Sequence, residues 1–149
     1  MIWKKIAGYD YSINEMGEVR NNKTGRILKA VSDNRDGYLV VCLSNNNKQK
    51  MHRIHRLLGE YFLSCPSDMQ VDHIDGNKLN NDLSNLRVVN NQQNHFNRTT
   101  AKGCYLNRSG NWFAQICVNG KAKNLGTYAT EELARAAYIA AKVIYHVIP

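Results

Sequence analysis

VDHIDGNKLNNDLSNLRVVNNQQNHFNR, residues 71–98, sets the architecture of the centre of this chain. It opens on a short apolar run, passes through a long polar loop and returns to an apolar run at residues 86–89, a pattern typical of two short β-strands joined by a loop. The polar residues that follow are compatible with a helix. The stretch therefore predicts the order strand, loop, strand, helix.

Asp72, His73 and Asp75 lie together where the first of these strands ends and the loop begins. Carboxylate oxygens bind Mg²⁺, which keeps positions for water and substrate phosphate, and a neutral imidazole beside them can take a proton from an attacking water. This chemistry matches metal-assisted phosphodiester hydrolysis. The alternative interpretation is a helix cap or a hydrogen-bonded surface pair.

The run VDHIDGNKLNNDLSNLRVV followed by NNQQNHFNR resembles the HNH motif of phage-type homing endonucleases, whose ββα-metal fold has the same order of elements. The resemblance implies a DNA endonuclease that uses Mg²⁺, with Mn²⁺ as the alternative ion. By position in the motif it implies that Asp72 is a metal ligand, that His73 is the general base and that Asn85 braces the long loop. By spacing it implies that Asn94, on the helix, is the second metal ligand.

Asn94 has rivals for that role. The chain contains nineteen asparagines, so an asparagine at a chosen spacing is a weak signal by itself. His95 is the main rival because many relatives place a histidine there, and Asn91 and Asn97 are weaker ones. Successive residues of a helix point about 100° apart, so Asn94 and His95 cannot both face one metal ion equally well. We take Asn94 as the ligand.

The segment HRLLGEYF, residues 55–62, places apolar side chains at helical spacing and predicts a short helix before the motif. It also resembles the supporting helix that precedes the motif in these endonucleases. His52 and His55 could be further ligands on one helical face. We favour the other interpretation, in which His55 is a cap or a hydrogen-bonded packing residue, and we expect Arg53 and Arg56 to contact phosphate.

The last third of the chain predicts strands near residues 104–107, 112–118 and 121–128, followed by an Ala-rich helix at about residues 131–146. The turn at Asn119-Gly120 is the strongest hairpin signal in the sequence, since Asn-Gly favours the backbone of a two-residue hairpin loop. Thr130 is the expected helix N-cap, with acidic residues in the first turn.

This last segment resembles the ethylene-response-factor type of DNA-binding domain, which is also found attached to HNH endonucleases. The shared features include Trp112, the pair Leu125-Gly126 and the Ala-rich helix. The resemblance implies that the sheet enters the major groove. It places Trp112 and Gln115 on the reading face, with four further residues close to phosphate or base edges: Arg108, Asn111, Lys121 and Lys123. Cys117 replaces an arginine of many plant members, and Trp112 could equally be a core or edge aromatic.

The first fifty residues alternate turn signals with short apolar runs and predict small antiparallel strands, the best of them at residues 37–43. They resemble the nuclease-associated modular domain that precedes many HNH motifs. Six basic residues could contact phosphate there or could form an ordinary solvated surface: Lys4, Lys5, Arg20, Lys23, Arg26 and Lys29.

The composition is that of one ordinary domain or a few small modules: 149 residues, 43% hydrophobic and 21% charged, with a net charge of +8. Residues 1–50 carry +4, residues 51–97 carry −1 and residues 98–149 carry +5. Basic ends would attract a polyanion. Four scattered cysteines indicate neither a zinc knuckle nor a disulfide scaffold, and the absence of a signal or membrane-spanning pattern favours the cytoplasm.

Together these features predict an α+β chain with three parts: a β-rich module at residues 1–50, an HNH ββα-metal core at 51–98 and an ethylene-response-factor-like domain at 99–149, built as a three-stranded antiparallel sheet packed on one helix. We expect a monomeric, site-specific homing-type endonuclease that nicks one strand of double-stranded DNA unless it dimerises. One alternative is a DNA-binding regulator whose nuclease motif has decayed, and another is a sequence-tolerant nuclease that degrades DNA.

Overall fold

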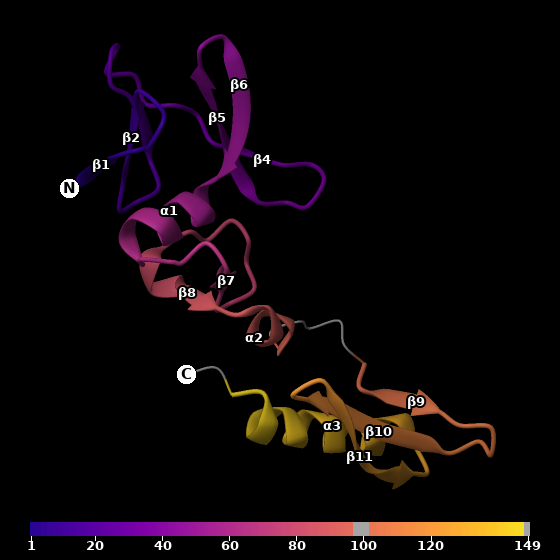
Figure 1. The fold of residues 1–149 in the computed structure, drawn as a ribbon. Helices are drawn as coiled ribbons and strands as arrows, with labels where there is room; N and C mark the ends of the chain where they lie inside the picture. The colour runs from indigo at the N-terminus through magenta and orange to yellow at the C-terminus, as the bar shows by residue number, and fades with distance from the viewer. Residues whose placement is uncertain (97–101, 148–149) are drawn as a thin grey trace. The chain divides into compact units, whose positions relative to one another are not determined.

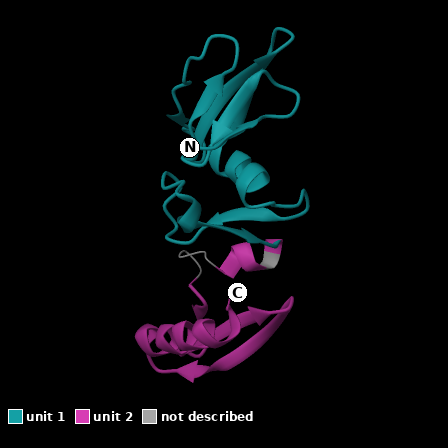
Figure 2. Cartoon of the chain, turned by 90° about the vertical axis from the view of Figure 1, so that its left-hand side faces the viewer, with its two compact units in different colours: residues 1–90 teal, residues 91–149 magenta. Residues whose placement is uncertain are grey.

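The computed structural model describes residues 1–96 and 102–147, apart from the side chain of Gln92. The chain forms two compact units, residues 1–90 and 91–149, which are taken one at a time (Figure 2). Both combine small antiparallel sheets with short helices, so the predicted α+β class is confirmed. No helix in the described ranges is both long enough and apolar enough to cross a membrane.

The first unit begins with two three-stranded antiparallel sheets (Figure 1). The strands of the first sheet are β1 (Trp3–Lys5), β2 (Tyr11–Asn14) and β3 (Val19–Asn21). Those of the second are β4 (Val31–Ser32), β5 (Leu39–Asn45) and β6 (Lys48–Arg53). Asn46 and Asn47 both have positive φ and make the tight turn between β5 and β6, as a two-residue hairpin loop requires.

The rest of the first unit is a helix followed by a two-stranded ribbon. Its elements are α1 (Ile54–Phe62), β7 (Gln70–His73), the single-turn 3₁₀ helix η1 (Leu83–Asn85) and β8 (Leu86–Val89). One hydrophobic core joins the sheets, α1 and the ribbon, through fully buried residues such as Ile13, Leu43 and Leu58. Residues 1–50 and the β7–β8 ribbon therefore share one core.

Gly59 lets α1 lie close against β7. A Cβ atom at this position would stand 2.2 Å from Cγ2 of Val71, whose β-branched side chain is buried in the same core. Because β7 carries Asp72 and His73, this close approach also sets the position of the candidate site.

Gly59→Ala is therefore expected to destabilise the first unit by about 1–3 kcal/mol, the usual cost of overpacking a core, even after the gain in helix propensity of up to about 1 kcal/mol. The measurement is the urea midpoint of unfolding, with Glu60→Ala on the exposed side of the same helix as the control. An unchanged midpoint for Gly59→Ala would show that Val71 moves aside at no cost.

The second unit contains α2 (Asn91–Phe96), three antiparallel strands and the long helix α3 (Glu131–Tyr145). The strands are β9 (Cys104–Leu106), β10 (Trp112–Val118) and β11 (Lys121–Tyr128), in the order β11-β10-β9. Asn119 and Gly120 both have positive φ, which confirms the predicted hairpin turn.

Helix α3 packs against the sheet of the second unit, over a core of small residues that includes Ala114 and Ala134 (Figure 1). Thr130 caps it, because its hydroxyl accepts a hydrogen bond from the N–H of Leu133 at 3.4 Å. Gly103 has a φ of 65°, and a Cβ there would meet the ring of Tyr138 at 2.1 Å. The ring of Phe96 stacks on that of His146 with centroids 4.0 Å apart, so α2 is attached to the end of α3.

Candidate active site

The register of β7 with β8 defines the centre of the candidate site. Asp72 pairs with Arg87 across the ribbon, and His73 pairs with Leu86. Arg87 donates to Oδ2 of Asp72 from Nε at 3.1 Å and from Nη2 at 2.9 Å, and the carboxylate is only 12% exposed. The ribbon therefore holds the Asp72 carboxylate in a fixed orientation beside His73.

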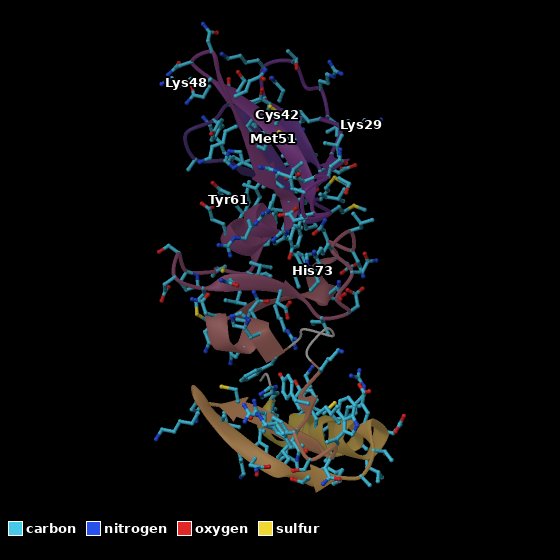
Figure 3. All side chains as sticks on the ribbon, turned by 90° about the vertical axis from the view of Figure 1, so that its right-hand side faces the viewer. Lys29, Cys42, Lys48, Met51, Tyr61 and His73 are labelled. Atoms are coloured by element: carbon cyan, nitrogen blue, oxygen red, sulfur yellow. The ribbon has the colours of Figure 1, made fainter. Side chains whose placement is uncertain are left out.

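His73, labelled in Figure 3, is 3% exposed, and two other rings lie next to its imidazole. Its ring centroid is 5.1 Å from that of His55 and 5.9 Å from that of Tyr38. On its edge, Nε2 lies 3.0 Å from Oδ1 of Asn81. These contacts fix both the plane of the imidazole and the direction in which it points.

His55 is a buried packing residue under Tyr38, with ring centroids 4.6 Å apart. Burial above all, together with the nearby positive charge of His73, Arg53 and Arg56, lowers the pKa of His55 to about 3, so the ring is neutral. The idea that His52 and His55 share a helical face is wrong, because β6 runs to Arg53 and the helix begins only at Ile54. His52 instead contacts the hydroxyl of Tyr9 at 3.1 Å, and burial lowers its pKa.

Asn85 ties the two ends of the long loop together. Its Nδ2 donates to Oδ1 of Asp75 and to the carbonyl of Asn80, both at 2.9 Å, and its Oδ1 accepts from the N–H of Asp75 at 3.1 Å. These are the contacts of a loop brace. Its part in catalysis stays a prediction.

The Asp75 carboxylate belongs to this loop. Besides Asn85, it accepts hydrogen bonds from the side chain of Asn80 at 2.8 Å and from the N–H of Asn77 at 2.7 Å. The hydrogen bonds from Asn80, Asn85 and Asn77, in that order of importance, lower the pKa of the Asp75 carboxyl. Asp75 therefore shapes the loop beside His73.

The sequence comparisons agree with this arrangement of strand, braced loop and strand. A family model described as HNH endonuclease matches residues 52–96, and one described as the NUMOD4 motif matches residues 1–44. The H-N-H endonuclease F-TflII of Escherichia phage T5 is 31% identical over 143 residues, which are 88% of this chain and 74% of that protein. The chain belongs to the HNH endonuclease family.

Other HNH endonucleases are also similar to it. DNA endonuclease I-HmuI of Bacillus phage SP01 is 39% identical over 106 residues, and a solved structure of this homing endonuclease matches 90% of the chain and 81% of its own length, with 33% identity and a TM-score of 0.60. An uncharacterised HNH endonuclease of Acanthamoeba polyphaga mimivirus is 45% identical over 94 residues. The chain spans only 28% of that mimivirus protein and 60% of I-HmuI in these sequence matches.

HNH nucleases are metal-dependent, and the donors at this ribbon fit a hard divalent cation. Asp72 would supply one carboxylate, which Arg87 orients as a hydrogen-bonding neighbour usually orients metal-ligating carboxylates. Across residues 1–96 and 102–147, no group of three or more His, Cys, Asp or Glu side chains is arranged to hold a metal ion. A cation held by few protein ligands keeps water and phosphate oxygens, which is the usual mode for Mg²⁺.

The predicted second metal ligand of the HNH motif lies in the other unit. Asn94, half-buried, and its exposed rival His95 lie on α2 with Asn91. The ribbon of Asp72, His73 and Asn85 belongs to the first unit. Asn97, the last rival, lies outside the described residues. The choice of Asn94 as second ligand stays a prediction.

In the second unit, Trp112 and Gln115 do not lie on the same face of the sheet. Side chains alternate along a strand, and the half-buried Trp112 packs against the core that contains Ala114 and Ala134, on the side of α3. Gln115, an odd number of residues away, points to the opposite face of β10. The expectation that Trp112 and Gln115 share one face is wrong, because the strand alternation and the packing of α3 put Trp112 inside.

Lys123 is also engaged on the helix side of this sheet. Its Nζ donates to the hydroxyl of Tyr145 at 2.6 Å and lies 4.4 Å from the centroid of that ring. Arg108, Asn111 and Lys121 are exposed at the turns of the sheet. Tyr105 and Phe113 lie on the outer face of the sheet, the face that also carries Gln115. Their ring centroids are 5.5 Å apart.

Two predicted phosphate contacts lie in the first unit. Arg53 is paired with the Asp36 carboxylate, and its guanidinium lies 5.0 Å from the Tyr38 ring centroid. Lys78 lies 4.9 Å from that centroid. Arg56 donates to the carbonyl of Met69 at 3.2 Å and is otherwise exposed. Arg53 and Lys78 thus place positive charge around Tyr38, whose ring contacts His73.

Sequence reasoning missed three residues of this HNH site: Tyr38, Asn81 and Arg87. Arg87 could have been found by pairing the two predicted strands, which sets it opposite Asp72. Tyr38 lies just before β5, about 35 residues away from His73 in the chain, and no local pattern indicates such a long-range contact. Asn81 is hidden among many asparagines of the same loop.

Proposed function

We propose that this chain is a site-specific HNH DNA endonuclease of the homing type, which hydrolyses a phosphodiester bond in one strand of double-stranded DNA. The observation that carries the proposal is the buried His73, held in one orientation beside the arginine-bound carboxylate of Asp72. A positioned imidazole next to a carboxylate is what general-base hydrolysis at a cation-bound phosphate requires.

In the proposed mechanism, His73 takes a proton from the attacking water. The water oxygen attacks the scissile phosphorus in line with the 3′ oxygen, a P–O bond forms, and the bond to the 3′ oxygen breaks. The leaving 3′ oxygen takes up a proton from solvent, and the products are a 5′ phosphate and a 3′ hydroxyl. Asn85 keeps the loop next to His73 in place during this step.

Asp72 and Asn94 would hold the divalent cation, which we take to be Mg²⁺ with Mn²⁺ as the alternative. When bound, such a cation stabilises the charge that develops on the phosphate and on the leaving oxygen. Arg87 keeps the Asp72 carboxylate turned and partly neutralised until the cation binds. The carboxylate is therefore presented without rearrangement of the ribbon.

The proposed partner is duplex DNA, contacted by three modules at residues 1–50, 51–98 and 99–149. I-HmuI is described as binding and cleaving DNA, and the charges of +4 and +5 at the ends of this chain favour a polyanion. Arg53 and Arg56 would contact backbone phosphates near the cleavage site. A monomer with one such centre cuts one strand in each binding event.

The test is incubation of the protein with supercoiled plasmid and with genomic DNA from its source, in Mg²⁺, in Mn²⁺ and in EDTA, with the new ends mapped by sequencing. Asp72→Ala is the matched variant. The expected result is metal-dependent nicks at a recurring sequence, absent with Asp72→Ala. Salt-sensitive binding without any new ends would overturn the nuclease proposal and favour a DNA-binding regulator. Linear product that forms as fast as nicked product would overturn single-strand cleavage.

Half-buried Gln115 and exposed Lys121, both in the second unit, should separate base reading from phosphate binding. Gln115→Ala is expected to weaken binding to the mapped site by about 1–3 kcal/mol and to leave other DNA unaffected. Lys121→Ala should weaken binding to all DNA. It should also reduce, by about 1, the slope of the logarithm of the binding constant against the logarithm of the salt concentration. Binding is measured by fluorescence anisotropy at several salt concentrations. Equal losses on both DNAs for Gln115→Ala would remove it from the reading face.

A further inference from the structure

Asn81 lies in the long loop between β7 and η1 and touches the edge of His73. Its Oδ1 is 3.0 Å from Nε2 of the imidazole. Both neighbours of Asn81 are tied down: the side chain of Asn80 donates to Asp75, and the carboxylate of Asp82 accepts from the N–H of Ser84 at 2.9 Å. The Asn81 amide is therefore carried by a loop whose backbone is fixed on both sides.

An amide oxygen only accepts hydrogen bonds, so the ring nitrogen that faces it must donate. In a neutral imidazole one nitrogen carries the proton and the other carries the lone pair. With Nε2 donating to Asn81, the lone pair of His73 lies on Nδ1. The rings of Tyr38 and His55, with centroids at 5.9 and 5.1 Å, keep the imidazole from turning over, so that Nε2 and not Cε1 stays opposite Oδ1 of Asn81.

We propose that Asn81 is a positioning residue that fixes the tautomer of His73, so that the lone pair that accepts the proton from water is on Nδ1. This proposal rests on the general-base role proposed for His73. Asn81 acts through its hydrogen bond to His73. Its effect is to keep all of the neutral imidazole in the tautomer that the reaction uses.

The chain offers a matched pair of variants of nearly equal side-chain volume. Asn81→Asp keeps an acceptor at Oδ1, and it breaks no hydrogen bond at the other atom, because within the described residues the buried Nδ2 of Asn81 has no partner. Asn81→Leu removes the acceptor but fills the same space. A purely structural role would make the two variants alike, whereas a tautomer role makes them differ.

The experiment is long-range ¹H–¹⁵N NMR of the ring nitrogens of His73 in the full-length protein without added metal, at a pH at which the ring is neutral. We expect the proton on Nε2 in the wild type and in Asn81→Asp, and a mixture of tautomers in Asn81→Leu. A proton on Nδ1 in the wild type would overturn the proposal directly, without need of any variant. So would an unchanged Nε2–H in a folded Asn81→Leu.

Steady-state nicking of the mapped DNA gives the second readout. Asn81→Leu is expected to lower kcat by about 2–10-fold, because only the part of the imidazole that stays in the Nε2–H tautomer remains active, with KM unchanged. An unchanged kcat would contradict the positioning role even if the NMR spectrum changed. If the wild type cut no DNA while its NMR showed Nε2–H, the proposed function would fail and the assignment of the tautomer would stand.

Discussion

His73→Ala is expected to lower the rate of DNA nicking by about 10²–10⁴-fold, the range over which a positioned general base contributes. Without the imidazole, the attacking water must give its proton to solvent. DNA affinity should stay close to that of the wild type, because the His73 side chain is 3% exposed and offers little surface for direct contact. The measurements are single-turnover nicking of the mapped site and equilibrium binding in the presence of Ca²⁺ or EDTA.

Two controls protect this result. Ile74→Ala changes the next residue, which is 48% exposed, and should leave both nicking and binding unchanged. Since removing a buried ring also leaves a cavity, the unfolding midpoint of His73→Ala must be measured, and His73→Gln keeps more of the volume without an equivalent base. Nicking by a folded His73→Ala within threefold of the wild type would eliminate His73 as the general base.

The buried His55 should make the first unit sensitive to mild acid. Its pKa is about 3 in the folded chain and near 6.5 when unfolded, so between these values the unfolded state binds the extra proton. The stabilising contribution is complete above pH 6.5 and is lost as the pH falls toward 3. The slope is about 1.4 kcal/mol for each pH unit, so about 2–3 kcal/mol should be lost between pH 6.5 and 4.5.

The groups that face His55 are His73, Arg53, Arg56 and Asp36. His55→Leu removes the titrating ring and keeps an apolar side chain, so its stability should depend less on pH over this window. The measurement is urea unfolding at several pH values in a Trp112→Phe background, in which Trp3 alone reports on the first unit. His95→Leu, at an exposed site in the second unit, is the control. Equal slopes for His55→Leu and its parent would contradict the assignment.

Local signals predicted the elements well. The Asn119-Gly120 turn and the Thr130 cap are each determined by two to four neighbouring residues, and both are as expected. The pairing of Asp72 with Arg87 depends only on the register of two adjacent strands. The order strand, loop, strand, helix around His73 follows from hydrophobic pattern alone.

Errors arose where packing between distant segments decides the orientation of a side chain. Trp112 was assigned to a DNA face from a resemblance, but the position of α3 determines which face of β10 is inside. His52 and His55 were weighed as a helical pair because spacing does not show that a strand ends between them. Asn81 could not be distinguished from its neighbours, since the loop backbone alone selects which amide meets His73.

The stacking of Phe96 on His146 has a consequence for building hybrid enzymes. Helix α2 carries Asn94 but takes its anchor from the last turns of the chain. A foreign recognition domain joined after residue 98 would leave α2 without this ring contact. If residues 91–149 are exchanged as one piece, α2 stays with the residue that supports it. This contact limits where DNA-recognition domains can be exchanged among such enzymes. The domain that brings a new DNA target must also bring α2, and with it Asn94.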